Sequence, residues 1–278
     1  MDQEESIFSL ERTANCRRLL RIGSANCRAK PTFRLQPLNT VLGVMREILQ
    51  ASDNKSLKQA LQSLDDTVKP RGDGRTSDQT ELWIIKRTLL TILKHMPLDY
   101  PVKLVKNERP DFLLHQGNIT IGIEVSEIVD SQLAKAQTLP ETQEPNTIID
   151  RSKFRLSDAN RTLEQLRELA SATKLDGPGW CGDSVERELA FGVGSWLENK
   201  RSKLSESSFK KCQQNWLVLY NNLQLPNIHL NIANPLIMGV VVPQLSDNSF
   251  NLLLLLSLPK LITYSESSYD TWDVENDP

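Results

Sequence analysis

Two short apolar segments joined by a Gly-Asn turn place the strongest constraint on the fold of this chain. Residues 111–115 and 119–126, in the stretch RPDFLLHQGNITIGIEVSEI, have the length and composition of β-strands. Gly117 and Asn118 between them form a dipeptide that is typical of tight hairpin turns. A hairpin that turns there brings residues 111 and 124 nearly opposite each other. The sequence therefore predicts an antiparallel hairpin that carries an acid on each strand.

Alternation along the second strand separates a core face from a polar face. The first face holds Ile119, Ile121, Ile123 and Val125, and the second holds Thr120, Gly122, Glu124 and Ser126. Asp111 on the neighbouring strand would face Glu124, and two carboxylates so placed repel each other. A divalent cation relieves that repulsion, and oxygen-only ligands favour Mg²⁺ or Mn²⁺. The alternative is an ordinary hairpin with an acid at a strand start and an edge-exposed glutamate.

Apolar periodicity predicts the other elements and the fold class. In chain order we expect helices at 40–51, 55–65 and 78–95, strands at 101–106, 111–115 and 119–126, helices at 156–170 and 184–204, and strands at 216–220, 236–242 and 251–258. This order predicts an α/β or α+β protein, with a mixed sheet flanked by helices and an N-terminal helical extension.

Composition shifts suggest three regions. The loop KPRGDGRTSD ends a region at 1–75 that combines a basic arm with the helical extension. The main domain follows at 76–265, and contains a weakly patterned insert at 130–180. The insert could be a lid, an interface or disordered. Residues 266–278 form an acidic tail that we expect to be disordered or loosely attached.

Charge and cysteine usage narrow the class of protein. The net charge of -2 gives no global attraction to nucleic acid, so any polyanion site must be local. A basic arm with Arg17, Arg18 and Arg21 could contact phosphates, or it could be a solvated leader. The four cysteines lack the spacing of a zinc site, and reduced thiols in a cytoplasmic protein are expected. The most hydrophobic segment, at 250–258, is too short to cross a membrane as a helix.

The PDF motif, followed across the hairpin by IGIEVSE, resembles the PD-(D/E)xK nuclease superfamily and its restriction-endonuclease-like fold. The resemblance covers residues 78–260 and rests on about a dozen positions. It implies a core of a helix, a three-strand meander, a helix and a further strand. It also implies that Asp111 and Glu124 bind Mg²⁺ or Mn²⁺ together with the backbone carbonyl of Val125, and that Glu81 on the first core helix supports the metal.

One position departs from that family pattern. The usual lysine, two residues after the glutamate, is Ser126 here. Some relatives carry the lysine on the following helix instead, and the apolar stripe of the helix at 184–204 is continued at Lys200. A lysine in such a stripe either reaches out to solvent or points into a polar site. We take Lys200 as the first candidate for the catalytic lysine and Lys203 as the second. Arg201 beside them is a candidate contact for nucleic acid.

Three functions follow from these observations. The first is a Mg²⁺-dependent nuclease that cleaves phosphodiester bonds, with DNA as the favoured substrate. The second is a nuclease-like fold without catalysis that binds nucleic acid or protein, which the serine at position 126 favours. The third is a helical regulator that acts through its basic arm, with the strands as a scaffold.

Overall fold

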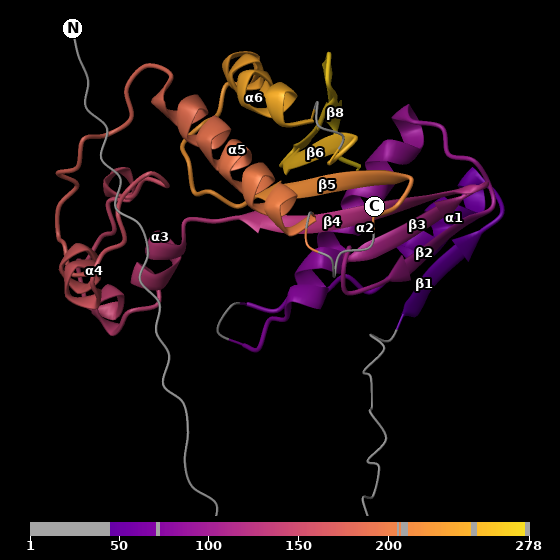
Figure 1. The fold of residues 1–278 in the computed structure, drawn as a ribbon. Helices are drawn as coiled ribbons and strands as arrows, with labels where there is room; N and C mark the ends of the chain where they lie inside the picture. The colour runs from indigo at the N-terminus through magenta and orange to yellow at the C-terminus, as the bar shows by residue number, and fades with distance from the viewer. Residues whose placement is uncertain (1–44, 71–72, 205, 207–210, 246–248, 276–278) are drawn as a thin grey trace, which may run out of the picture. The chain divides into compact units, whose positions relative to one another are not determined.

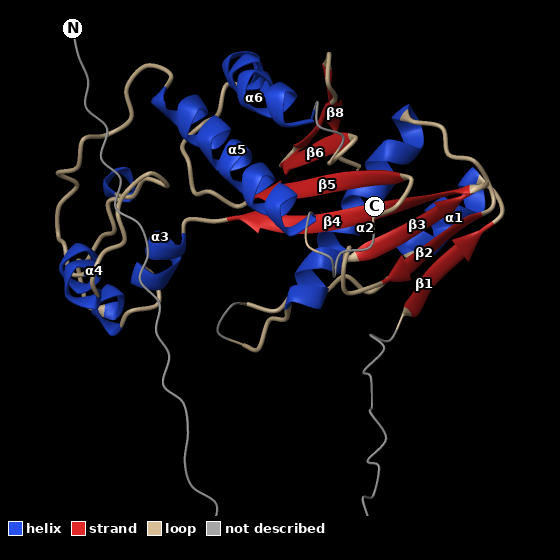
Figure 2. Cartoon of the chain, in the orientation of Figure 1, coloured by secondary structure: helices blue, strands red, loops and turns tan. Residues whose placement is uncertain are grey.

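A mixed β-sheet, whose strands lie in chain order, forms the centre of the protein (Figure 2). The computed structural model describes residues 45–278 apart from 71–72, 205, 207–210, 246–248 and 276–278. Its eight described strands are β1 (Arg46–Ala51), β2 (Val102–Lys106), β3 (Phe112–Gln116), β4 (Ile119–Ile128), β5 (Gln214–Asn221), β6 (Leu252–Ser257), β7 (Lys260–Tyr264) and β8 (Tyr269–Asp273). Strands β4, β5 and β6 are parallel, and the other neighbours pair antiparallel. The predicted α/β class with a mixed sheet is confirmed.

Helices cover both faces of this sheet (Figure 1). On one face lie α1 (Asn54–Gln62) and α2 (Ser77–His95), and on the other lie α5 (Ser184–Leu204) and α6 (Leu230–Leu245). Successive side chains of a strand point to opposite faces of the sheet, so each strand contributes to two separate hydrophobic cores, one on each face. Ile121, Ile123 and Val125 pack with α1 and α2, whereas Leu217 and Leu219 pack with α5 and α6.

The hairpin has the predicted register. Phe112 pairs with Ile123 and Gln116 pairs with Ile119, around Gly117, which has a positive φ of 49°. Continuing this register by one residue sets Asp111 opposite Glu124. Strand β4 runs on beyond the end of β3, and its last residues pair with β5 alone. The free side of β4 at this end is where Asp111 lies.

The helix expected at 40–51 is wrong for the part that the structure describes. Residues Arg46–Ala51 form strand β1, which pairs with β2 and has a register shift between Glu47 and Leu49. Leu49 and Ala51 are buried while Gln50 between them is exposed, which is the period of a strand. A cluster of apolar residues this short fits either period, and the open edge of β2 decides the outcome.

The strand expected at 236–242 is also wrong, since these residues lie within α6. The run LIMGVVV is rich in β-branched residues, which favours a strand locally. Helix α6 instead buries Ala233, Ile237 and Val241 against α5 and the sheet. Its sequence is apolar on every side, so no helical stripe could be seen in the pattern.

The acidic tail is not disordered at residues 269–273. They form β8, the edge strand beside β7, and Lys260 pairs with Asp273 at 2.6 Å. Trp272 stacks on His95 with ring centroids 4.7 Å apart, which ties the strand to the end of α2. One aromatic contact and a strand partner therefore outweigh the acidic composition.

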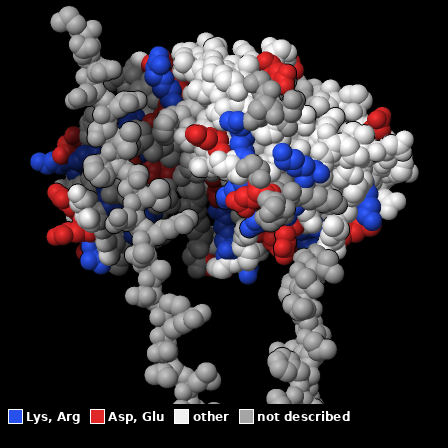
Figure 3. Space-filling model, in the orientation of Figure 1, with Lys and Arg blue, Asp and Glu red and all other residues white. Residues whose placement is uncertain are grey.

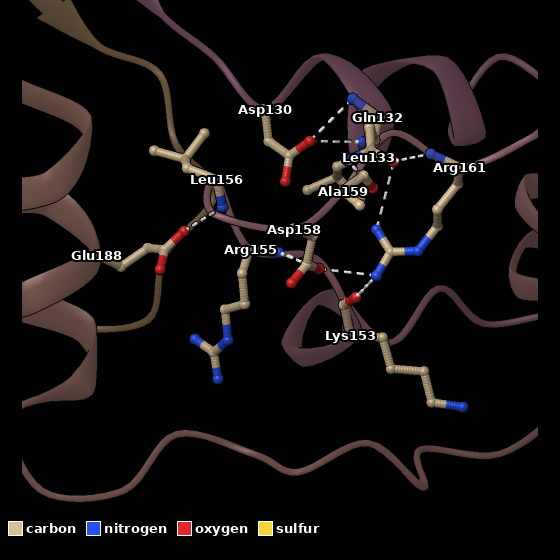
Figure 4. Close-up of polar contacts among 10 residues, drawn as sticks. All are labelled: Asp130, Gln132, Leu133, Lys153, Arg155, Leu156, Asp158, Ala159, Arg161 and Glu188. Atoms are coloured by element: carbon tan, nitrogen blue, oxygen red, sulfur yellow. Dashed lines mark hydrogen bonds and ion pairs between the residues drawn. The ribbon is translucent and has the colours of Figure 1, made fainter. Parts of the chain in front are cut away.

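The insert is folded around a small core of its own. It contains α3 (Ser131–Ala136), two short 3-10 helices at Pro140–Gln143 and Arg151–Lys153, and α4 (Leu163–Ala170). The helix expected at 156–170 is limited to α4. Leu133, Phe154 and Leu166 are among the buried residues that α3 and α4 enclose. Polar contacts complete it (Figure 4): Asp130 caps α3, and Glu188 of α5 accepts a hydrogen bond from the backbone of Leu156.

The expected N-terminal helical extension is part of the main core. Within 45–75, only α1 is helical, and the described residues belong to one compact unit. The boundary suggested near residue 75 falls inside that unit. Leu57 and Leu61 of α1 are fully buried against α2 and the sheet.

Truncating Leu57 should therefore destabilise the whole described fold. We expect Leu57→Ala to lower the free energy of unfolding by about 2–5 kcal/mol, because it leaves a cavity in the main core. Leu175→Ala, at a position that is 66% exposed, is the control and should change it by less than about 0.5 kcal/mol. Urea denaturation measures both. If Leu57→Ala left the midpoint of the urea transition unchanged, α1 would not contribute to the stability of the fold.

Candidate functional site

Asp111 is held at the start of β3 by the loop before it and by β4. Asn107 donates to the backbone carbonyl of Asp111 at 2.8 Å, and its side chain donates to the carbonyl of Pro110 at 2.9 Å. The Asp111 carboxylate accepts a hydrogen bond from the backbone N–H of Val125 at 2.7 Å. That bond uses a β4 donor which β3 is too short to reach. The carboxylate is thereby fixed beside Glu124.

Gly122 allows Pro110, the residue before Asp111, to lie close to β4, because a glycine has no side chain. A Cβ atom at position 122 would lie 2.9 Å from the side chain of Pro110, closer than real Cβ contacts permit. Pro110 therefore occupies the space over β4 on the face that also carries Glu124. The absence of a side chain at Gly122 thus leaves room for Pro110 beside the acids.

Glu124 is buried and paired with Lys200. Its side chain is 10% exposed, and its Oε1 lies 2.6 Å from Nζ of Lys200, whose side chain is 15% exposed. The other carboxylate oxygen, Oε2, is buried and has no hydrogen-bond partner among the residues that the structure describes. Leu189, Val193 and Leu197 bury the stripe of α5 that leads to Lys200. The lysine placed by the stripe thus points inward, to a glutamate 76 residues earlier.

Glu81 lies on α2 near the same carboxylates. It pairs with Lys106 at the end of β2, and its side chain is 18% exposed. Lys106 also lies 3.6 Å from Asp78 and over the ring of Phe112. Sequence analysis did not single out Lys106. It ends a strand at a position where its charge could equally have been solvated.

The acids act on one another electrostatically. Burial, with the negative charges of Glu124 and Glu81, raises the pKa of Asp111 to about 7. The Val125 N–H and the charge of Lys200 lower it, but less strongly. Asp111, Glu124, Glu81 and Lys200 therefore form a single electrostatic group. The prediction that Asp111 and Glu124 lie together is confirmed.

A cavity of about 620 Å³ opens at this group, beside the free end of β4. Asp111, Val125 and Ser126 line it from the hairpin, Glu81 from α2 and Lys200 from α5. Ser131 and Ala134 of α3 form another part of the wall, so the insert borders the site. A volume of this size accommodates a small-molecule or nucleotide-sized group.

The remaining candidate residues lie elsewhere. Lys203 is exposed and borders a separate hollow with Glu124 and Arg109, not the main cavity. Arg201 is partly exposed on the last turn of α5. Arg17, Arg18 and Arg21 lie outside the described residues. Of the two lysines, Lys200 is thus the one that pairs with Glu124 and lines the main cavity.

Two charged residues of the cavity were missed by sequence reasoning. Arg75 precedes α2 in what reads as a plain loop, and the alternation of the strand places Glu127 on the face opposite Glu124. Both line the cavity, and they form an ion pair at 3.1 Å. Parity does turn Glu127 away from Glu124. No local signal marks either residue, because the cavity wraps around the end of β4 and receives side chains from both faces.

The chain has no match among known proteins, and its described residues contain no ready-made cluster of metal ligands. No family model, curated protein or solved structure matches this chain. In residues 45–278, outside the gaps, no group of three or more His, Cys, Asp and Glu side chains is arranged to hold a metal ion. Within the same residues, each helix is too short or too polar to cross a membrane.

Proposed function

We propose that this protein is a Mg²⁺- or Mn²⁺-dependent nuclease that hydrolyses phosphodiester bonds of nucleic acid, with DNA as the favoured substrate. One observation carries the proposal. Asp111, Glu81 and Lys200, from three distant parts of the sequence, line one cavity, and Glu124 pairs with Lys200 and interacts electrostatically with Asp111. Perturbed ionisable groups that gather in a cavity are typical of catalytic sites.

The electrostatics of the site fit a divalent cation. Asp111 has a raised pKa because it is buried and because other carboxylates lie near it, and Glu124 Oε2 is buried without a partner among the described residues. A hard cation relieves both, because it offsets the repulsion and accepts the unpaired oxygen. Asp111 and Glu124 would hold it, with the carbonyl of Val125 and with Glu81 in support. In this arrangement two carboxylates, those of Asp111 and Glu124, are the principal ligands. Such a site differs from a cluster of three or more acidic, histidine or cysteine side chains, which the described residues do not contain.

In the proposed hydrolysis, Lys200 and Asp111 have separate roles. The metal, when bound, supplies Lewis-acid polarisation of the phosphate and acidifies water. Lys200 holds a positive charge beside Glu124, where it can orient the attacking water and offset the charge that develops on the phosphate. Asp111 must be ionised to act as a ligand, and the N–H of Val125 favours that form.

The arrangement of elements supports the same family. The chain runs through α2, the meander β2–β3–β4, α5 and β5, which is the order that the resemblance to PD-(D/E)xK nucleases implies. On the face shown in Figure 3, basic and acidic side chains are interspersed rather than gathered in a basic patch. Binding would therefore depend on local contacts such as Arg201 and the cavity. We also propose that the protein is cytoplasmic, as expected from the spacing of its cysteines.

Cleavage of labelled oligonucleotides tests the proposal. Single-stranded and duplex DNA and RNA are incubated with the full chain in Mg²⁺, in Mn²⁺ and in EDTA. We expect cleavage of at least one DNA substrate that needs the metal and is lost in EDTA. A protein that neither binds Mn²⁺ in calorimetry nor cleaves any of these substrates would contradict the nuclease proposal.

The second candidate is a catalytically inactive module that binds nucleic acid or protein. Ser126 favours it, because the hydroxyl that lines the cavity carries no charge where the family usually has a lysine. Metal binding without cleavage, together with binding of an oligonucleotide, would support this alternative.

A further inference from the structure

Arg75 is a positively charged residue of the cavity that has no role in the proposed hydrolysis. It lies just before α2 and lines the same cavity as Asp111 and Lys200. Its side chain is only 19% exposed, although arginine side chains usually reach into solvent. A partly buried guanidinium beside a catalytic cavity needs an explanation, because removing it from water is costly.

The guanidinium of Arg75 is fixed in one orientation. Its Nε donates to Thr80 Oγ1 at 2.8 Å, and its Nη2 donates to the two oxygens of Glu127 at 3.1 and 3.3 Å. Glu127 is itself held by the side-chain amide of Asn222. These bonds use one edge of the planar group. Within the part of the chain that the structure describes, Nη1 forms no hydrogen bond and remains available to a ligand.

The charges around the cavity indicate what that ligand is. Both cations of the lining are paired, Lys200 with Glu124 and Arg75 with Glu127. Lys200 is directed at a proposed metal ligand, whereas Arg75 keeps its Nη1 for an anion. A planar guanidinium with a preset orientation matches a phosphate better than a point charge does. Thr76, Ser77 and Ser131 also line the cavity, and hydroxyl groups of this kind can donate to phosphate oxygens.

We propose that Arg75 binds a backbone phosphate of the substrate next to the one that is cleaved. This inference rests on the proposed nuclease function and adds a substrate-binding residue to it. Arg75 takes no part in the bond cleavage. Its contribution is to fix the register of the strand relative to Asp111 and Glu124.

The competing explanation is that Arg75 and Glu127 only tether the loop before α2 to β4. The two explanations differ in the effect of Glu127. If the pair is a tether, removing either charge has the same effect. If Arg75 binds phosphate, removing its charge weakens binding, while removing the charge of Glu127 leaves the cation in place and frees its donors.

Salt-dependent binding separates the two. The proteins compared are Asp111→Asn, which should not cleave, and the same protein with Arg75→Gln or with Glu127→Gln added. Fluorescence anisotropy with a labelled DNA strand is measured from about 50 to 200 mM salt, since each phosphate contact adds about 0.7 to 0.9 to the slope of log K against log salt. We expect Arg75→Gln to lower this slope by about that amount and to weaken binding about tenfold. Glu127→Gln should leave the slope unchanged and binding no weaker.

Three results have distinct meanings. Equal slopes and affinities for the parent and Arg75→Gln, or equal losses in Arg75→Gln and Glu127→Gln, would overturn the role of Arg75. If the wild type neither cleaves nor binds the strand, the nuclease proposal itself fails. Should Arg75→Gln not fold, Arg75→Lys replaces it. That variant keeps the charge and loses the planar group, so binding should weaken at least about threefold, and unchanged binding would overturn the proposal.

Discussion

Asp111→Asn should abolish Mn²⁺ binding and cleavage and, in the absence of metal, should make the protein more stable at pH 8. Asparagine keeps an oxygen that can accept the Val125 N–H, so the local geometry is preserved. It removes a carboxylate whose negative charge burial and the neighbouring Glu124 and Glu81 disfavour. Loss of a principal ligand should lower the cleavage rate by at least about 100-fold.

The stability gain has a definite pH dependence. The pKa of Asp111 is raised to about 7 in the folded state, against 3.8 for an ordinary aspartate. Between these values the folded protein binds more protons than the unfolded chain, so rising pH lowers the stability of the wild type. The penalty is absent below pH 4 and complete above pH 7. Asp111→Asn should therefore match the wild type near pH 4 and exceed it by about 1–3 kcal/mol at pH 8.

Thermal and urea denaturation at pH 4, 6 and 8, with and without Mn²⁺, measures these effects. Mn²⁺ should stabilise the wild type increasingly as pH rises through about 7, because a ligand that binds only the folded state adds stability. Asp73→Asn, in an exposed turn, is the matched control and should keep Mn²⁺ binding and activity. An Asp111→Asn protein that binds Mn²⁺ as the wild type does would remove Asp111 from the metal site.

Lys200→Ala should inactivate the enzyme and also destabilise the fold. Glu124 is buried and, within the described part of the chain, one of its oxygens is bonded to Lys200 and the other has no partner. Removing the lysine leaves a buried carboxylate without compensation, which costs about 3–5 kcal/mol. A loss of activity alone would therefore not prove a catalytic role, because part of the protein could be unfolded.

A second substitution separates stability from catalysis. Lys200→Met combined with Glu124→Gln removes both charges, so we expect most of the lost stability to return while cleavage stays absent. Lys203→Ala, on an exposed side chain one turn further along α5, is the control and should change stability little. Guanidinium chloride melts and single-turnover cleavage assays provide the measurements. Full activity in Lys200→Ala would remove this lysine from the mechanism.

The sequence by itself determined the hairpin, its register and the pairing of its acids. Alternation along 119–126 and the Gly117–Asn118 turn are local signals, and they suffice to set Asp111 opposite Glu124. The stripe on α5 likewise identified Lys200, because a helix keeps residues three or four apart on one side. Both predictions depend only on the period of a single element.

Only the tertiary structure decided the features that need a partner from elsewhere in the chain. Arg46–Ala51 became a strand because β2 offers an open edge, and LIMGVVV became a helix because α5 and the sheet bury it. Arg75 and Glu127 joined the cavity because their positions depend on where α2 crosses the end of β4. Periodicity records which side of an element is buried, but not which other element buries it, and that choice is made by packing between distant segments.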